Sequence, residues 1–149
     1  MGRRLGAARL RVSTFEYLDI DDVMGMIPVL EIGPVRDVGL LDSAVNRPRS
    51  SAFGEDAYQT IDLKTAALLH SLTMHHALVD GNKRIAWLCT VVFCDLNNYA
   101  LSLTDNEAFD LVREIASSQM EVAAIANRLR LTATITERLD QELKDADQE

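Results

Sequence analysis

Cysteine is scarce in this sequence, which argues against a fold stapled by disulfides. The 149 residues include two cysteines, Cys89 and Cys94, both inside an apolar stretch. On a helix, positions five apart lie about 140° from each other around the axis, so the two thiols are poorly placed to pair. We expect both to act as small core side chains in a reducing, cytoplasmic setting.

Positive charge is also in short supply. The chain has 15 Lys and Arg residues against 23 Asp and Glu residues, a formal charge of -8. Contacts with nucleic-acid phosphates need lysines and arginines clustered over a broad face, so this balance argues against a nucleic-acid-binding surface. The exception is Arg3, Arg4, Arg9 and Arg11, with no acidic residue among them. We expect residues 1–13 to form a basic N-terminal extension, either a disordered leader or, as the less favoured alternative, an arm that contacts RNA.

A long apolar run is missing as well. The stretch Ile85 to Leu96 is too short to cross a bilayer, for which about 18 to 20 residues are needed. The basic start is not followed by the apolar segment of a signal peptide. We therefore expect no membrane segment and a cytoplasmic location.

What the sequence does contain is a succession of helical patterns, with enough apolar material for one core. Apolar spacing predicts helices over Asp19 or Ile20 to Ile32, Asp37 to Asn46, Ile61 to Ala77, Ile85 to Leu96, Asp105 to Ala116 and Gln119 to Leu131. The fold class is therefore all-α. We predict one helical domain over residues 14–131, followed by an acidic helix or tail over 132–149.

Local signals set the expected ends of these helices. Gly33-Pro34 should end the first one, with Gly33 in a left-handed conformation. Thr104 with Glu107, and Ser118 with Glu121, match the capping-box pattern and should open the last two. Residues 47–60 show no sustained period and are predicted to be a loop.

A polar cluster interrupts the helical pattern at residues 76–84, which read His-Ala-Leu-Val-Asp-Gly-Asn-Lys-Arg. The apolar residues 85–96 that follow are expected to form a central helix buried on every side. The cluster thus lies at a helix N-terminus, where unpaired backbone N–H groups and the positive end of the helix dipole favour an anion. Gly81 allows a close approach, Lys83 is a point charge, and Arg84 can grip two phosphate oxygens, so we predict a phosphate site.

The other residues of the cluster suit phosphoryl or nucleotidyl transfer. His76 is the candidate general base, because an imidazole titrates near neutral pH. Asp80 offers a hard oxygen ligand that could hold Mg²⁺ against a polyphosphate. The side chain of Asn82 is expected to cap the central helix, while the backbone N–H groups around it face the phosphates.

Each of these residues also has a purely structural interpretation. Taken singly, His76 is more often a hydrogen-bonding residue at a helix end than a catalyst, and we assign that structural role to His70 and His75. Asp80-Gly81 alone is a turn signal, and Asn82 alone a helix cap. Zinc binding by the adjacent histidines is disfavoured, because they would point about 100° apart and no further ligand pattern follows. The combination of residues at the start of one helix is what favours a functional site.

At these residues the sequence resembles the Fic/Doc family, whose motif runs His-x-Phe-x-Asp/Glu-Gly/Ala-Asn-Gly/Lys-Arg. Residues 76 and 80–84 match that motif position by position. Lys83 indicates the Doc toxins, since the Fic adenylyltransferases typically have Gly there. The likeness extends to residues 33–41, 53–56 and 96–99, and covers residues 17–131.

The resemblance implies a Fic/Doc-like helical bundle and a toxin of a type II toxin–antitoxin module, with a small Phd-like antitoxin as partner. It also implies a protein kinase that transfers the γ-phosphate of ATP to a Ser/Thr hydroxyl, expected to belong to elongation factor Tu, and so arrests translation. His76 would deprotonate the target hydroxyl, and Asp80 would bind Mg²⁺ or orient the site. The phosphates of ATP would be held by Gly81, Asn82, Lys83 and Arg84. The loop from Ser50 to Tyr58 would be the flap against which the target segment lies.

Three positions depart from the family pattern. Leu78 replaces the motif Phe, which should alter packing rather than chemistry. Trp87 stands where Fic adenylyltransferases carry a second Arg that binds nucleotide phosphates, which argues against AMP transfer. Met74 stands where Doc proteins often have a basic residue. The alternatives that stay open are a Fic-type protein adenylyltransferase and a catalytically inactive Doc-like binding protein.

Overall fold

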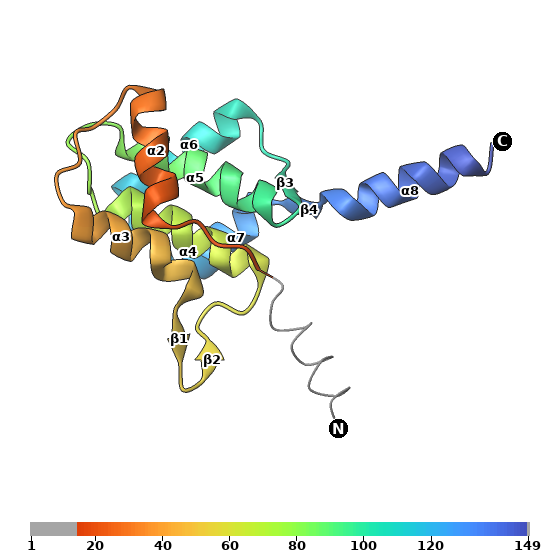
Figure 1. Ribbon diagram of the computed structural model, residues 1–149, viewed down its shortest axis with the longest axis horizontal. Helices are drawn as coiled ribbons and strands as arrows, with labels where there is room; N and C mark the ends of the chain where they lie inside the picture. Colours follow the sequence, from red (N-terminus) through yellow and green to blue (C-terminus); the bar gives the residue numbers. More distant parts are fainter. Residues whose placement is uncertain (1–14, 149) are drawn as a thin grey trace.

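The computed structural model describes residues 15–148, without the side chains of residues 135–138. It is mostly helical, which confirms the predicted all-α fold (Figure 1). The helices are α2 (Ile20–Leu30), α3 (Val38–Asn46), the short 3-10 helix η1 (Arg47–Arg49), α4 (Ile61–Met74), α5 (Asn82–Leu96), α6 (Asp105–Ser117), α7 (Val122–Leu129) and α8 (Thr134–Ala146). Two small antiparallel ribbons pair β1 (Ser51–Ala52) with β2 (Glu55–Asp56) and β3 (Tyr99–Leu101) with β4 (Leu131–Ala133). The predicted basic extension, residues 1–13, lies outside the described residues.

Helices α4 and α5 form the centre of the bundle, and α2, α3, α6 and α7 pack around them (Figure 1). Side chains on every face of α4 are buried, including polar ones such as Thr65 and Ser71. Both hydroxyls are satisfied within the structure: Thr65 donates to the carbonyl of Ile61, and Ser71 to that of Ala44. α4 therefore behaves as the buried helix of the fold.

The prediction that α5 is buried on every side is wrong. Its inner face is buried, with Ile85, Cys89 and Phe93 almost inaccessible to solvent. On its outer face Val91 is 39% exposed and Leu96 44% exposed. The reason is that α2 and α6 flank α5 without closing over it, so part of its apolar surface lines an open trough instead of a core.

Residues 47–60 contain more structure than the predicted loop. The 3-10 helix and the β1–β2 hairpin are held by Lys64, whose side chain is fully buried. Its Nζ donates to the carbonyl of Pro48 at 3.2 Å and to Oδ2 of Asp56 at 3.0 Å, and lies 4.9 Å from the centre of the Phe15 ring. A buried ammonium group is tolerated only with such partners. No period in the sequence could indicate this tertiary anchor.

The helix ends agree with the local signals only in part. The capping box of Thr104 and Glu107 is present and confirms the predicted start of α6. The one predicted for Ser118 and Glu121 is wrong, because the Ser118 hydroxyl donates to the carbonyl of Glu114 and serves the end of α6 instead. The first helix ends at Leu30, two residues before the predicted end at Ile32, and Glu31 is the left-handed residue that follows it. Gly33 has the expected positive φ, 105°.

The C-terminal part of the chain forms a ribbon that was not predicted. β4 pairs antiparallel with β3, with Tyr99 opposite Ala133 and Leu101 opposite Leu131. This pairing takes Leu131 out of the helix predicted over Gln119 to Leu131, and α7 is only eight residues long. The expected boundary between residues 131 and 132 therefore falls inside β4, and α8 extends away from the bundle (Figure 1).

The two cysteines lie in the core. Cys89 and Cys94 are both free and buried, as expected of core side chains. Burial raises the pKa of Cys89 to about 12 and that of Cys94 to about 11. Among the residues that the structure describes, no helix has both the length and the apolar character that a bilayer crossing requires.

Candidate active site

The polar cluster forms the connection between α4 and α5. α4 ends at Met74, three residues before the predicted end at Ala77. His76 then adopts a left-handed backbone conformation with φ of 49°, and Gly81 a second one with φ of 95°. These two positions turn the chain, so that α5 begins at Asn82.

An upstream segment braces this connection from the side. Residues 33–37 run antiparallel to residues 77–80, joined by a bridge between Val35 and Leu78. The N–H of Gly33 donates to the carbonyl of Asp80 at 2.9 Å, and the N–H of Val79 to that of Pro34 at 3.0 Å. The backbone of residues 77–80 is thus hydrogen-bonded to residues 33–37 as in a pair of antiparallel strands. Because its carbonyl and N–H groups bond to this neighbouring segment, they cannot continue the hydrogen bonds of α4, and the helix ends early.

Arg36 adds a side-chain contact to the brace. Its guanidinium group donates to the carbonyl of His76, and its backbone N–H to the carbonyl of Ala77 at 2.7 Å. The contact fixes the backbone of the candidate base and leaves its imidazole free. Arg36 was not among the residues predicted for the site, although it lies in one of the stretches that resemble the family.

The side chain of Asn82 does not cap the central helix as predicted. Its Oδ1 accepts a hydrogen bond from the N–H of Leu78 at 2.9 Å, and its Nδ2 donates to the carbonyl of Leu78 at 2.9 Å. The amide therefore closes the turn as a peptide group would. The expected contribution of Asn82 to phosphate binding is then limited to its backbone N–H.

The first N–H groups of α5 are left for a ligand. Gly81 is the N-cap residue and has no side chain with which to cap the helix, and the first backbone bond of the helix runs from Ile85 to Gly81 at 3.0 Å. Among the described residues, no acceptor is bonded to the N–H groups of Asn82, Lys83 and Arg84. Together with the helix dipole, these free N–H groups have the arrangement that the predicted anion site requires.

Gly81 is needed here for space as well as for its backbone conformation. A Cβ atom at this position would lie 2.5 Å from both Cβ and Cγ2 of Ile32, well inside van der Waals contact. The start of α5 is therefore packed directly on Ile32, the residue that precedes the bracing segment. That packing sets where the free N–H groups point.

A cavity of about 380 Å³ opens at this helix end, and its wall includes His76 and all the predicted site residues. It is lined by Thr73, His76, Val79, Asp80, Gly81, Asn82, Lys83, Arg84, Phe109 and Ala116. His76 is exposed, and no described residue hydrogen-bonds to its ring. The imidazole is therefore available to a substrate that enters the cavity.

The cavity also contains a residue that sequence analysis did not identify. Thr73 is 1% exposed, and its hydroxyl has no hydrogen-bond partner among the described residues. An unpaired buried hydroxyl costs about 1–3 kcal/mol, so a residue of this kind beside a functional cavity is a candidate for ligand contact. A threonine among the apolar residues of α4 carried no signal that could have identified it.

The charged side chains around the cavity are mostly exposed to solvent. Arg84 pairs with Asp80 at 3.5 Å, with 57% and 78% of their side chains accessible. Such an exposed i,i+4 ion pair is weak. Each of the two side chains can therefore leave the other and bind a ligand. In the described part of the chain no three His, Cys, Asp or Glu side chains gather as a metal site, so a cation at Asp80 would need phosphate oxygens as further ligands.

The other two histidines have structural contacts, in line with the predicted role. Nδ1 of His75 lies 3.3 Å from the carbonyl oxygen of Leu40, and Nδ1 of His70 lies 2.7 Å from a guanidinium nitrogen of Arg47. Burial, followed by the positive charge of Arg47, lowers the pKa of His70. His70 therefore stays neutral and accepts the bond from Arg47.

The hairpin that was predicted as a flap is anchored away from the cavity. Its Asp56 binds Lys64 in the first turn of α4, whereas the cluster follows the other end of that helix (Figure 1). From Lys64 to Met74 the helix rises about 15 Å. At the tip of the hairpin Phe53 is fully exposed and Gly54 has a φ of 80°. A role for the hairpin in binding a target stays a prediction.

The chain has clear similarity to known proteins. Residues 13–94 match the model of the Fic/DOC family. Over 118 residues the chain is 44% identical to "Toxin Doc" of Mycolicibacterium smegmatis (strain ATCC 700084 / mc(2)155), an alignment that covers 76% of this chain and 91% of the relative. These similarities confirm the resemblance inferred from residues 76–84.

Proposed function

The chain belongs to the Fic/DOC family, as a Doc-like member, and from this premise we propose that it is a toxin that phosphorylates a protein target. It transfers the γ-phosphate of ATP to a Ser/Thr hydroxyl, and elongation factor Tu is the expected target. Arrest of translation follows, which places its action in the cytoplasm. A Phd-like antitoxin is the proposed partner that restrains it.

The observation that carries this proposal is that one cavity contains an unengaged imidazole and the unpaired N–H groups at the start of α5. The N–H groups of Asn82, Lys83 and Arg84, with the two cationic side chains, suit the charge of a polyphosphate. His76 suits the removal of a proton from an alcohol that attacks it. Phosphoryl transfer depends mostly on such positioning and charge neutralisation.

The proposed step conserves atoms and charge. The target hydroxyl oxygen forms a bond to the γ-phosphorus while the bond from that phosphorus to the β,γ-bridging oxygen breaks. His76 accepts the hydroxyl proton, and ADP leaves. Arg84 and Lys83 stabilise the charge on the phosphate oxygens, and Arg36 keeps the backbone of His76 in place.

The residues present fit a bound Mg²⁺ next to the phosphates. Asp80 is largely exposed at the edge of the cavity and offers one carboxylate, which is what Mg²⁺ commonly takes from a protein when phosphates and waters supply its other ligands. The ion would neutralise phosphate charge there. Arg84 would then exchange its contact with Asp80 for one with a phosphate.

Phosphate transfer is favoured over AMP transfer by two residues. Lys83 follows the Doc form of the motif, and Trp87 replaces the second Arg expected of an adenylyltransferase. Trp87 lies one turn of α5 beyond Lys83, where an indole cannot neutralise phosphates. The negatively charged end of a nucleotide is therefore expected near Gly81 and not farther along α5.

The proposed antitoxin should complement the charge of this chain. With a formal charge of -8, the toxin is expected to bind a segment with basic or apolar anchors, and a helix laid in a groove would suit its helical surface. Co-purification with the product of a neighbouring gene tests this part.

The activity is tested with ATP labelled at one phosphate and purified elongation factor Tu. Label from the γ position should reach the factor with the wild-type chain and be lost with His76→Asn, a substitution chosen because asparagine tolerates the left-handed conformation of residue 76. His75→Asn is the matched control, since its imidazole contacts the carbonyl of Leu40 and does not line the cavity.

Other outcomes would contradict the proposal. Transfer of label from the α position would indicate adenylyl transfer. Growth arrest that is unchanged by His76→Asn, with no label transferred, would indicate an inactive protein that acts by binding.

A further inference from the structure

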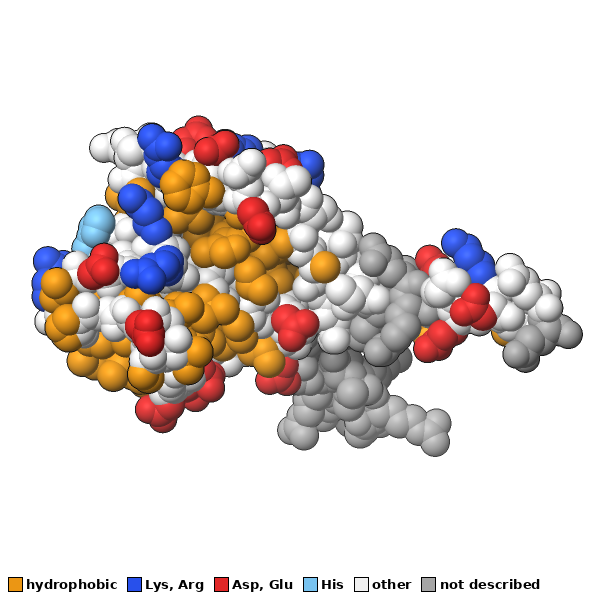
Figure 2. All heavy atoms as spheres, turned by 90° about the horizontal axis from the view of Figure 1, so that it is seen from above, with side chains coloured by type: hydrophobic (Ala, Val, Ile, Leu, Met, Phe, Trp, Pro, Cys, Tyr) orange, Lys and Arg blue, Asp and Glu red, His pale blue; other side chains and the backbone are white. Residues whose placement is uncertain are grey.

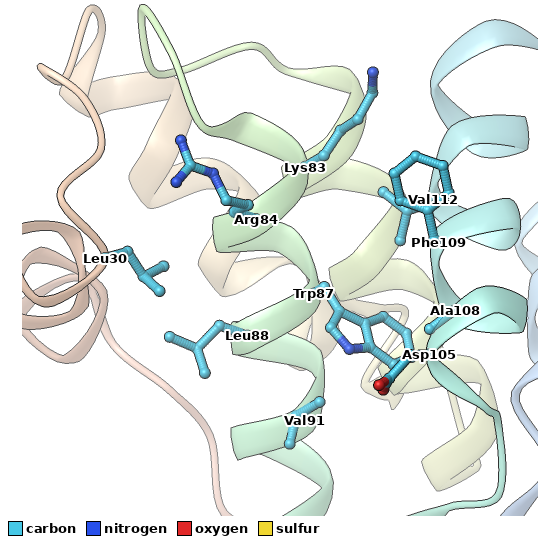
Figure 3. A pocket seen from close by; sticks show the side chains of 10 residues that line it. All are labelled: Leu30, Lys83, Arg84, Trp87, Leu88, Val91, Asp105, Ala108, Phe109 and Val112. Atoms are coloured by element: carbon cyan, nitrogen blue, oxygen red, sulfur yellow. The ribbon is translucent and has the colours of Figure 1, made fainter.

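A second hollow lies beside the candidate site, between α2, α5 and α6 (Figure 3). This trough has a volume of about 480 Å³, and apolar side chains form most of its wall. Leu88 and Val91 of α5 face Leu30 of α2, with Ala108 and Val112 on the α6 side. Figure 2 shows the corresponding face of the molecule, an apolar strip with Lys and Arg side chains beside it.

The trough and the cavity of His76 are neighbouring parts of one channel. Lys83, Arg84 and Phe109 line both. Along α6, Ala116 lines the cavity, Phe109 lies in the shared part, and Asp105 lies only in the trough. A ligand can therefore extend from the start of α5 along that helix without leaving the channel.

We propose that the trough binds the purine base of the nucleoside triphosphate whose phosphates lie at the start of α5. The inference rests on the proposed function, which requires such a nucleotide but does not say where its base lies. It adds a binding site for an aromatic heterocycle, with Trp87 as its aromatic wall.

The distribution of charge along the channel suits that orientation. The cations Lys83 and Arg84 lie at the shared end, where phosphates would be, and Asp105 is the one acidic residue among the described residues that line the trough. The indole of Trp87 lies between them, one turn or about 6 Å of helix beyond Lys83. A purine can stack on an indole, and the exocyclic amine of adenine can donate to the Asp105 carboxylate.

The size of the trough favours a small molecule. Pockets for small ligands have volumes of about 300–1,000 Å³ and an apolar wall with few polar groups. The trough meets both conditions, and its cationic end continues into the phosphate site. An antitoxin segment in the trough is the competing occupant, which the experiments below separate from a base.

The chain provides its own probe, because Trp87 is its one tryptophan. The full chain is titrated with ATP, with adenosine, and with inorganic tripolyphosphate, which has the charges but no base. ATP and adenosine should change the Trp87 emission, and tripolyphosphate should compete with ATP while causing less change. ATP should bind at least tenfold more tightly than tripolyphosphate.

The three titrations separate failure of the base site from failure of the proposed function. If tripolyphosphate binds as tightly as ATP and adenosine leaves Trp87 unchanged, the base site is refuted while the phosphate site stands. If adenosine binds and tripolyphosphate does not compete with ATP, the proposed function fails and the base site stands. If none of the three binds, both fail.

Two pairs of variants locate the base. Val91→Glu places a charge at the far end of the trough and should weaken ATP binding at least tenfold without affecting tripolyphosphate. Val29→Glu, at an 80% exposed position outside the trough, is its control. Asp105→Ala should remove the preference for ATP over inosine triphosphate, which has a carbonyl in place of the amine, and Asn106→Ala should keep it. Equal ATP affinity in Val91→Glu and wild type would overturn the proposal.

Discussion

Replacement of Gly81 by alanine is expected to destabilise the protein strongly, because two independent costs meet at this position. The backbone of Gly81 has a φ of 95°, and an added Cβ would lie 2.5 Å from two carbon atoms of Ile32. A left-handed backbone costs an L-residue about 1–2 kcal/mol. Extra atoms forced into a packed site cost about 1–3 kcal/mol. The free energy of unfolding should therefore fall by about 2–5 kcal/mol in Gly81→Ala.

Two other glycines allow the costs to be separated. Gly54 has a φ of 80° and open space around it, so Gly54→Ala should show only the backbone cost of about 1–2 kcal/mol. Gly25 lies inside α2 with nothing within 4 Å of an added Cβ. In that helix alanine is the better residue, and Gly25→Ala should stabilise the protein by about 0.5–1 kcal/mol.

Urea denaturation followed by far-UV circular dichroism measures all three variants against the wild type. A double-mutant cycle with Ile32→Gly, which removes both of the clashing carbon atoms, isolates the steric part, which should appear as a favourable coupling of about 1–3 kcal/mol between the two substitutions. The reasoning would be refuted if Gly81→Ala lost no more stability than Gly54→Ala, or if the cycle showed no coupling. Either result would mean that α5 does not start in packing contact with Ile32.

Three further predictions concern side chains around the site and the core. Thr73→Val should raise the free energy of unfolding by about 1 kcal/mol, because it removes an unpaired buried hydroxyl. If that hydroxyl contacts a ligand, the same substitution should lower the rate of phosphoryl transfer about 2- to 10-fold. Full activity of the variant would show that the hydroxyl makes no such contact. The lowered pKa of His70 means that the unfolded chain binds more protons than the folded one, so stability should decline as pH falls below the ordinary His pKa of 6.5 until the folded-state pKa is passed. Denaturation curves of His70→Gln should show a weaker decline, and an unchanged one would exclude His70 as its source. Burial raises the pKa of Cys89 to about 12 and that of Cys94 to about 11, so neither thiol should react with a thiol reagent at pH 8 until the protein unfolds. Labelling of either cysteine in the native chain would contradict their burial.

The fold class and the position of the polar cluster at the start of a helix were predictable because both depend on short stretches of sequence. Apolar spacing specifies helices wherever one face must be buried, and a capping box such as that of Thr104 and Glu107 needs only four consecutive residues. The cluster at residues 76–84 is equally local. The predictions that failed were those in which a local signal competed with a distant partner, as at Ser118, whose hydroxyl serves the preceding helix.

Details of the candidate site depended on distant segments. The early end of α4 results from hydrogen bonds to residues 33–37, which lie about 40 positions upstream. Asparagine is a residue type that often caps helices, but the turn brings the backbone of Leu78 within reach of the Asn82 side-chain amide. Neither relation has a period or a motif in the sequence, because both depend on the chain folding back on itself.

By itself the sequence determined the helical fold and the residues gathered at the start of α5, since these follow from periodicity and from consecutive residues, and it indicated the family through the motif at residues 76–84. Only the tertiary structure decided which faces of the helices are covered. An apolar helix can be buried or can line an open trough, and the difference for α5 depends on how α2 and α6 pack beside it. That packing is a property of distant surfaces meeting in space, which periodicity within one helix does not encode.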